Sequence, residues 1–217
     1  MCIWWVCVLC VLAVCPIAGQ DDAGDPVLDF YTQRAASVFR SADPMQAGTT
    51  YSFRATSYYL KLEAGRPPKR VDSSVVDFYF SFDQLDSLIV QTETSDRFDL
   101  VDLSIPPIFE GPYFFNFFPN DTGGTEIAIG FDTDSTNTTN PTGLAILNRD
   151  RCTLERIYLC YPNVENHRRF SRGLRLTTVN GRVYPDSAWI IGARYGIFST
   201  DHYRIETRID SLKVYSP

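Results

Sequence analysis

The sequence predicts a mainly β protein: one N-terminal helix, then a strongly curved antiparallel sheet or unclosed β-barrel, with an aromatic-rich loop or lid covering it. From Thr49 onward, hydrophobic residues recur at every second position, which is the period of strands that bury one face. About eight to ten such segments follow a single helical stretch, and no strand–helix–strand alternation occurs. Neighbouring strands should therefore be antiparallel, and so long a sheet should curve toward closure.

Length and composition indicate one folded domain. The chain has 217 residues, enough for a substantial core. Aromatic residues make up 14% of it and hydrophobic residues 44%, which excludes a disordered protein. The formal net charge of −6 argues against nucleic acid as a partner attracted by bulk electrostatics. We expect a single domain over residues 26–217.

The N-terminal stretch has the character of an export signal. Residues 1–19 carry no charge and are nearly all apolar, and polar residues begin at Gln20. This pattern predicts a signal peptide or lipoprotein leader over residues 1–20, and so an exported, periplasmic protein. A permanent membrane helix is the alternative, but the run is barely long enough and has no basic flank.

A cysteine within the leader raises the possibility that the protein is lipidated after export. Leu12-Ala-Val-Cys15 is similar to the lipobox of bacterial lipoproteins, although Val14 stands where a small residue is usual. By that resemblance, a lipidated Cys15 would anchor the mature protein to a membrane. An incidental cysteine is the alternative interpretation.

One amphipathic helix is predicted over residues 26–41. Asp25 can cap it, and Pro26 is tolerated at the first helical position. The residues near one helical face are Val27, Phe30, Tyr31, Arg34, Val38 and, one position off, Phe39. We expect this face to pack on the sheet.

The strands that follow alternate aromatic and polar residues. On one face of the first strand lie Tyr51, Phe53, Ala55, Ser57 and Tyr59, and on one face of the second lie Val76, Phe78, Phe80 and Phe82. Residues 85–92 can return as a third strand. Asn180-Gly181 predicts a tight hairpin later in the chain, because both central residues of a type I′ turn need positive φ.

An aromatic and proline-rich stretch, residues 105–119, interrupts the strands. Its four prolines lack the N–H that a sheet interior needs, so we interpret it as a covering insertion. Aromatic side chains bury roughly 150–250 Å² each, so the stretch should lie against a sheet, a ligand or a membrane. Two roles stay open: a lid over a ligand cavity, or a plug that fills the core.

The sequence contains no constellation that predicts catalysis. His167 and His202 are the only histidines, and we expect both at the surface or a sheet edge. A metal site needs several convergent ligands and a catalytic triad needs an oriented base, so we expect neither an enzyme nor a cofactor. Asp132, Asp134 and Asn137 are spaced like the start of a calcium loop, but an exposed polar loop is the favoured interpretation.

Basic residues and cysteines in the second half have simple interpretations. The local arginines should form cross-strand ion pairs, with an anion-binding face as the alternative. They are Arg149, Arg151, Arg156, Arg168, Arg169, Arg172 and Arg175. Cys152 and Cys160 should lie about 26 Å apart along one strand, beyond disulfide reach, as two buried thiols.

The order of these features resembles the lipoprotein-carrier superfamily of the bacterial periplasm, the LolA, LolB, RseB and LppX group. The nearest local similarities are Pro141-Thr-Gly-Leu-Ala-Ile-Leu147 and Asn180-Gly-Arg-Val-Tyr-Pro185, which open strands. The resemblance implies an unclosed barrel whose concave apolar face accepts acyl chains beneath helices and a lid, with no catalytic residue. It implies that Phe109, Tyr113, Phe114, Phe117 and Phe118 lie on or near the lid, and that Phe78, Phe80, Phe82 and Trp189 line the sheet.

Two functions follow as hypotheses. The first is a cell-envelope protein that binds a lipid, a lipoprotein acyl chain or another apolar ligand, with a role in lipoprotein sorting or transport. The second is a structural or interaction domain with a filled core and an envelope protein as partner. The size and lining of any cavity beneath residues 105–119 should separate them.

Overall fold

The computed structural model describes residues 25–43, 48–81, 88–93, 102–117, 124–134, 140–196 and 199–215. The elements are α2 (Pro26–Ala42), β1 (Thr50–Lys61), β2 (Lys69–Phe80), β3 (Leu88–Glu93), β4 (Phe114–Phe117), β5 (Glu126–Asp132), β6 (Thr142–Asn148), β7 (Leu154–Tyr161), β8 (His167–Val179), β9 (Arg182–Tyr195) and β10 (Thr200–Tyr215).

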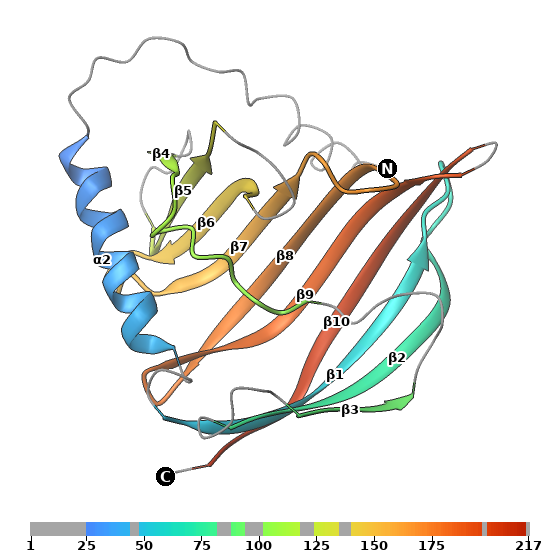
Figure 1. The fold of residues 1–217 in the computed structure, drawn as a ribbon, viewed down its shortest axis with the longest axis horizontal. Helices are drawn as coiled ribbons and strands as arrows, with labels where there is room; N and C mark the ends of the chain where they lie inside the picture. Colours follow the sequence, from blue (N-terminus) through green and yellow to red (C-terminus); the bar gives the residue numbers. More distant parts are fainter. Residues whose placement is uncertain are drawn as a thin grey trace.

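All ten strands form one antiparallel sheet. Its order is β3-β2-β1-β10-β9-β8-β7-β6-β5-β4, so β3 and β4 stand at opposite edges. Figure 1 shows the sheet strongly curved and open, with α2 on its concave side beside β5 to β7. The predicted fold class, a curved antiparallel sheet after one N-terminal helix, is confirmed.

The helix begins and ends close to its predicted bounds. The Asp25 carboxylate accepts hydrogen bonds from the backbone N–H groups of Val27 at 2.9 Å and Leu28 at 3.4 Å, satisfying donors that have no partner inside the helix. The predicted buried face was partly wrong, because Val27 and Phe30 are 54% and 60% exposed. The inward stripe is instead Leu28, Tyr31, Ala35, Phe39 and Ala42, whose steps of three or four residues keep one face toward the core.

Strands β1 and β2 follow the predicted alternation. Tyr51, Phe53 and Ala55 on β1 are buried, as are Val76 and Phe78 on β2. Their intervening residues point to the other face, where the Arg54 guanidinium pairs with Asp77 at 2.7 Å. Phe82 lies outside the described residues.

The concave face carries two hydrophobic clusters. The larger one, here called the helix-side core, lies under α2 and consists of Ala35, Ile108, Ile127, Ile129, Phe131, Ala145, Leu147, Leu154, Ile157, Leu159, Leu174, Leu176, Ala188, Tyr203 and Ile205. The second, here called the aromatic floor, consists of Tyr51, Phe53, Ala55, Val76, Phe78 and Tyr184. Leu103 packs against both clusters, so it marks their border.

The chain between β3 and β4 has to cross the sheet from one edge to the other. Residues 102–113, here called the cover segment, pass in front of β9, β8 and β7 toward α2 in Figure 1. Ile108 of this segment is 1% exposed and belongs to the helix-side core. Part of the proline-rich stretch nevertheless pairs as a strand, because β4 contains no proline and stands at a sheet edge.

The two cysteines outside the predicted leader are free thiols. Cys152 is buried in the turn before β7, but Cys160 is exposed, so the expectation of two buried thiols was wrong for Cys160. Its strand neighbour Leu159 is fully buried on the concave face, and successive side chains of a strand point to opposite faces.

Candidate functional site

The aromatic floor is built from stacked rings of neighbouring strands. Tyr51 and Phe53 on β1 stand directly opposite Phe80 and Phe78 on β2 in the strand register. The ring centroids of these two cross-strand pairs lie 4.7 Å and 5.0 Å apart, and both pairs are stacked. Tyr184 of β9 meets Tyr51 edge-on at 5.1 Å. Such pairs stabilise a sheet face while leaving flat apolar surfaces.

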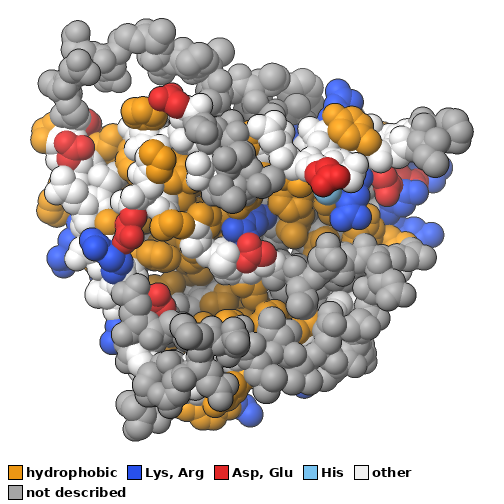
Figure 2. Space-filling view, in the orientation of Figure 1, with side chains coloured by type: hydrophobic (Ala, Val, Ile, Leu, Met, Phe, Trp, Pro, Cys, Tyr) orange, Lys and Arg blue, Asp and Glu red, His pale blue; other side chains and the backbone are white. Residues whose placement is uncertain are grey.

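Little of the cover segment contacts this floor. Among the described residues, the partly buried hydrophobic side chains packed against it are Phe80, Leu103, Val179, Ile209, Leu212 and Val214. Leu103 is the single member of that group that comes from the cover segment, and the others belong to strands. Figure 2 shows hydrophobic side chains at the bottom of a hollow on this side of the molecule.

A buried arginine fixes the cover segment at the border between the two clusters. The side chain of Arg172 on β8 is 8% exposed. Its Nη1 donates to the Asp102 carboxylate at 2.5 Å and to the Asp102 carbonyl at 2.9 Å, and its Nε donates to the Tyr161 hydroxyl at 3.0 Å. Burial alone would raise the pKa of Asp102, but hydrogen bonds from Ser104 and Arg172 outweigh it and hold that pKa below its usual value.

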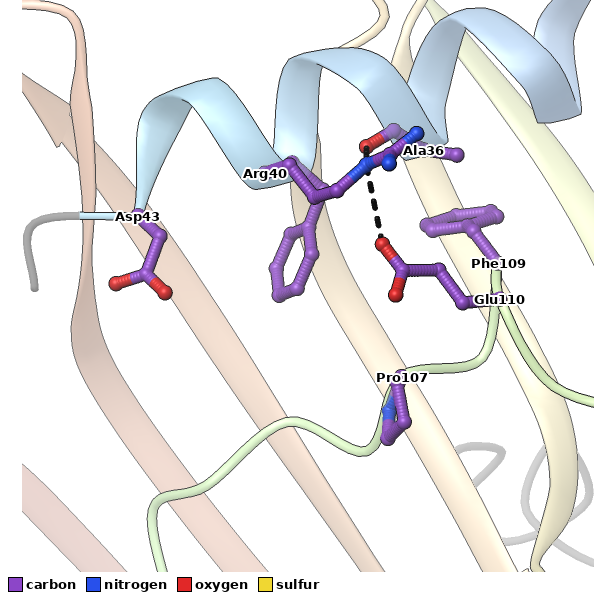
Figure 3. A pocket seen from close by; sticks show the side chains of 7 residues that line it. Ala36, Arg40, Asp43, Pro107, Phe109 and Glu110 are labelled. Carbon is purple, nitrogen blue, oxygen red and sulfur yellow. Dashed lines mark hydrogen bonds and ion pairs between the residues drawn. The ribbon is translucent and has the colours of Figure 1, made fainter. Parts of the chain in front are cut away.

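The space between α2 and the cover segment is small. A cavity of about 120 Å³ lies there, and its wall includes Phe39, Phe109 and Pro107. Figure 3 shows Phe109 and Pro107 facing the helix across it. The Arg40 guanidinium and the Glu110 carboxylate meet across it at 3.1 Å. Ligand pockets usually measure roughly 300–1,000 Å³, so this cavity does not accommodate a lipid chain.

The residues predicted for the lid do not form one surface. Phe109, Tyr113 and Phe117 are partly buried against the helix-side core, where Tyr113 contacts Phe131 edge-on with the ring centroids 5.5 Å apart. Phe114 is 63% exposed. Phe118, like Phe82, lies outside the described residues. On this side the aromatic stretch therefore fills the core as a plug would.

Phe78 belongs to the aromatic floor and Phe80 packs against it, whereas Trp189 lies on the other face of the sheet. Gly173 on β8 is opposite Trp189 in the register, and a Cβ added at Gly173 would meet the indole ring at 2.2 Å. Leu174, the next residue, is buried in the helix-side core, so Gly173 and Trp189 face the convex side. Tyr158, 36% exposed, packs edge-on against Trp189 with the ring centroids 5.3 Å apart.

Three aromatic residues of the floor, Tyr51, Phe53 and Tyr184, were not predicted as site residues. Tyr51 and Phe53 share the period-two alternation and oppose Phe80 and Phe78, so their spacing alone carried the signal. Tyr184 had no such signal, because its place depends on how β9 curves behind the β8–β9 turn.

A polar group at the other end of the concave face involves His167, which the sequence predicted at the surface or a sheet edge. The imidazole is half-buried at the start of β8, with Nε2 2.8 Å from the Tyr203 hydroxyl, and it receives a hydrogen bond from Arg194 Nε at 3.1 Å. Its Nδ1 lies 2.8 Å from the Glu165 carbonyl, which can only accept. Nε2 therefore accepts a hydrogen bond from Arg194, and Nδ1 donates one to the Glu165 carbonyl. Burial raises the pKa of Tyr203, which is 1% exposed.

Other candidate features carry no chemistry in the described residues. Among them, no three side chains of His, Cys, Asp or Glu gather as metal ligands, and Asn137 of the predicted calcium loop lies outside them. Arg156 pairs with Glu126 and Arg175 with Asp186, as expected for arginines on strands. No helix in this part of the chain has the length and hydropathy that a membrane crossing requires.

No protein-family model and no curated protein matches this sequence. The solved structures that match include the crystal structure of the LolA superfamily protein NE2245 from Nitrosomonas europaea, at 9% identity. The match covers 88% of this chain and 94% of that chain, with a TM-score of 0.37. It belongs to the superfamily that the layout of the sequence resembles. At this TM-score, what the chain binds has to be argued from its own residues.

Proposed function

We propose that this protein is an exported, non-enzymatic binding protein of the cell envelope that holds a lipid, an acyl chain or another apolar ligand. The observation that carries the proposal is the unequal cover of the concave face. The helix-side core is sealed by α2 and the cover segment, whereas the aromatic floor meets only Leu103 of the described cover residues. The floor residues are 0–8% exposed, so a ligand would have to enter between these rings and the chain that covers them.

The chemistry of the floor suits a hydrocarbon chain. Burying apolar surface yields roughly 25 cal/mol per Å², or about 0.8 kcal/mol for each methylene group removed from water. Stacked rings offer flat faces along β1 and β2, so a flexible chain can contact several of them without a shaped pocket. The Asp77 carboxylate of β2 points to the opposite face and pairs with Arg54. Among the described residues the floor therefore offers contact surface and no paired acid and base, which favours binding without catalysis.

Export and the envelope location belong to the same proposal. They rest on residues 1–24, which lie outside the described residues, and a lipidated Cys15 would add a membrane anchor. A role in lipoprotein sorting or transport is the finer form of this function, with the acyl chain of a lipoprotein as the ligand.

A filled structural or protein-interaction domain is the second candidate. It is favoured by Ile108, which is 1% exposed in the helix-side core, and by the cavity of about 120 Å³ beside it. In that case the aromatic stretch would be a plug throughout, and the envelope partner would be a protein.

Native mass spectrometry of the full chain, expressed with its leader and purified from a bacterial envelope, tests the proposal. We expect an apolar molecule to copurify and to be recovered by organic extraction. Phe80→Ala removes a floor ring and should reduce the bound fraction severalfold, because each aromatic side chain contributes roughly 150–250 Å² of contact. Tyr79→Ala, its neighbour on the opposite face and 38% exposed, is the matched control and should keep the ligand.

Two results would contradict ligand binding on the floor. The first is wild-type protein that carries no apolar molecule and takes up none from detergent-solubilised lipid. The second is equal loss of ligand in both variants, which would place the ligand elsewhere.

A further inference from the structure

Positive charge gathers at one end of the sheet, although the chain as a whole carries a net charge of −6. This end, here called the basic end, consists of residues 61–72, 165–169, 194–196 and 199–202. These stretches contain seven Lys or Arg residues and four Asp or Glu residues. Figure 2 shows Lys and Arg side chains gathered at the right-hand side of the molecule, where Figure 1 shows the β1–β2 and β9–β10 turns.

Strand pairing holds these stretches side by side. The backbone N–H of Leu62, after β1, donates to the carbonyl of His202 on β10 at 2.9 Å. Arg194 of β9 lies opposite Asp201 of β10 and also opposite His167 of β8. Basic residues that are far apart in the sequence therefore share one end of the folded sheet.

Much of this positive charge is not neutralised. The Glu63 carboxylate is shared by two cations, Lys61 at 3.6 Å and Arg66 at 2.9 Å. Lys69 is exposed and lies directly opposite Lys61 in the strand register, an arrangement of like charges that destabilises a sheet. Three further basic residues of this end are exposed and form no ion pair with a described residue: Arg70, Arg168 and Arg169.

Exposed apolar groups accompany these charges. Tyr195 at the end of β9 is 64% exposed, and Val71 of β2 is 39% exposed. Tyrosine is enriched where a membrane meets water, because its ring is apolar and its hydroxyl is polar. Lys and Arg side chains bury their apolar stems in the same zone while the charged group stays in water. A lipid surface matches this combination better than an acidic peptide, which would use the charges alone.

We propose that the basic end docks on a membrane surface that contains anionic phospholipids, with its Lys and Arg side chains on the phosphate groups and Tyr195 at headgroup level. The attraction has to come from this end, because the chain as a whole is acidic, and it should orient the protein on the membrane. This docking does not depend on ligand binding at the concave face.

Partition onto phosphatidylcholine vesicles with and without phosphatidylglycerol tests the proposal, using the full chain expressed with its leader and purified from a bacterial envelope. The measured quantity is the ratio of the two partition coefficients, so any attachment through the leader, which both vesicles share, cancels. Each basic residue near an anionic surface strengthens binding by about fivefold. For an excess of three positive charges, we expect a ratio of about a hundred for the wild type. The ratio should fall steeply between about 0.1 M and 1 M salt, because the Debye length shortens from about 10 Å to 3 Å.

Lys69→Gln/Arg169→Gln should lower the ratio by about 25-fold, as for the loss of two basic residues. Arg151→Gln/Lys213→Gln is the matched control, because it removes the same charge at exposed positions toward the other end of the sheet. Along β10, Lys213 lies roughly 35 Å from His202, several Debye lengths away. The control should therefore keep the ratio within about twofold of wild type.

Urea denaturation separates docking from a folding defect. Lys69→Gln should be as stable as the wild type or more stable, because the repulsion from Lys61 is removed. A merely structural lysine would lower stability when replaced.

Three results would overturn the docking proposal. The first is equal partition of the wild type onto both kinds of vesicle. The second is an equal loss in the two double variants, because net charge and not its location would then decide. The third is a preference for soluble polyglutamate over phosphatidylglycerol vesicles, which would assign the basic end to an acidic protein partner. Recovery of an apolar molecule from the purified protein is a separate measurement, so failure of either proposal leaves the other standing.

Discussion

The two halves of the concave face are lined by strands of one continuous sheet, yet they are covered in different ways. The helix-side core is mostly aliphatic and is closed by Ile108 of the cover segment together with Ala35 of α2. The aromatic floor is lined by stacked rings and meets the described part of the cover segment only at Leu103. Aliphatic side chains interdigitate to close-packed density, whereas stacked rings stabilise one another and still present a flat apolar surface.

The border between the halves is polar and fixed. Arg172 holds the backbone and the carboxylate of Asp102, and the next residue, Leu103, contacts both clusters. The described part of the cover segment therefore packs mainly on one half of a ten-stranded sheet. This difference teaches that a segment crossing a sheet can be fixed at one point and act as a plug on one side of it.

Ile108→Ala should produce the largest effect on stability, because it empties a site that is 1% exposed in the sealed half. We expect the free energy of unfolding to fall by about 2–4 kcal/mol, as for other buried Ile→Ala changes. Urea denaturation followed by circular dichroism would measure it, with an unchanged m-value. A loss below about 1 kcal/mol would mean that the cover segment is a loose lid and not a plug.

Substitutions in the Arg172–Asp102 pair should lower stability less than Ile108→Ala does, and the two partners should differ in their effect. Asp102→Asn should lower stability by about 1–3 kcal/mol at neutral pH, because the buried guanidinium loses its counter-charge. Arg172→Met should cost less, since the side chain of Asp102 is 62% exposed and can be solvated. Urea titrations of both variants would measure this order, and the reverse order would contradict the role of Asp102 as the partner of a buried charge.

The same pair gives a pH dependence with a definite sign. The pKa of Asp102 is lowered in the folded protein, so its contribution is complete above the unfolded value near 3.9 and is lost as pH falls through the folded value. Wild-type stability should drop more steeply than that of Asp102→Asn below about pH 4. Urea denaturation at several acidic pH values would measure both curves. If the stability of the wild type and of Asp102→Asn fell equally with pH, Asp102 would not be the group responsible.

Much of the sheet could be predicted because burial of one face imposes a period of two. Tyr51, Phe53 and Phe78 were assigned to their faces correctly for this reason. Arg172 carried a readable signal as well, since alternation places it on the same face as Leu174. Its partner could not be predicted, because Asp102 is 70 residues away and meets it only when the chain crosses the sheet.

The errors came from register and strand order, which local patterns do not fix. The edge positions of β3 and β4 decide that the cover segment crosses the concave face, and no periodicity contains that information. The helix face was predicted partly wrongly because large apolar residues were given more weight than alanines, although Ala35 is the most buried residue of α2.

Trp189→Ala should have the smallest effect on ligand affinity, and it tests whether the ligand binds the concave face and not the convex face. Trp189→Ala should leave the affinity for an apolar ligand within about twofold of wild type, because the indole packs over Gly173 and Tyr158 on the convex side. The free energy of unfolding should fall, because an aromatic contact is lost. Urea denaturation would measure this loss. Displacement of the uncharged fluorescent probe N-phenyl-1-naphthylamine by methyl hexadecanoate would measure the affinity. Phe80→Ala would be the positive control. A loss of affinity equal to that of Phe80→Ala would place the ligand on the convex face and overturn the assignment of the aromatic floor as the binding surface.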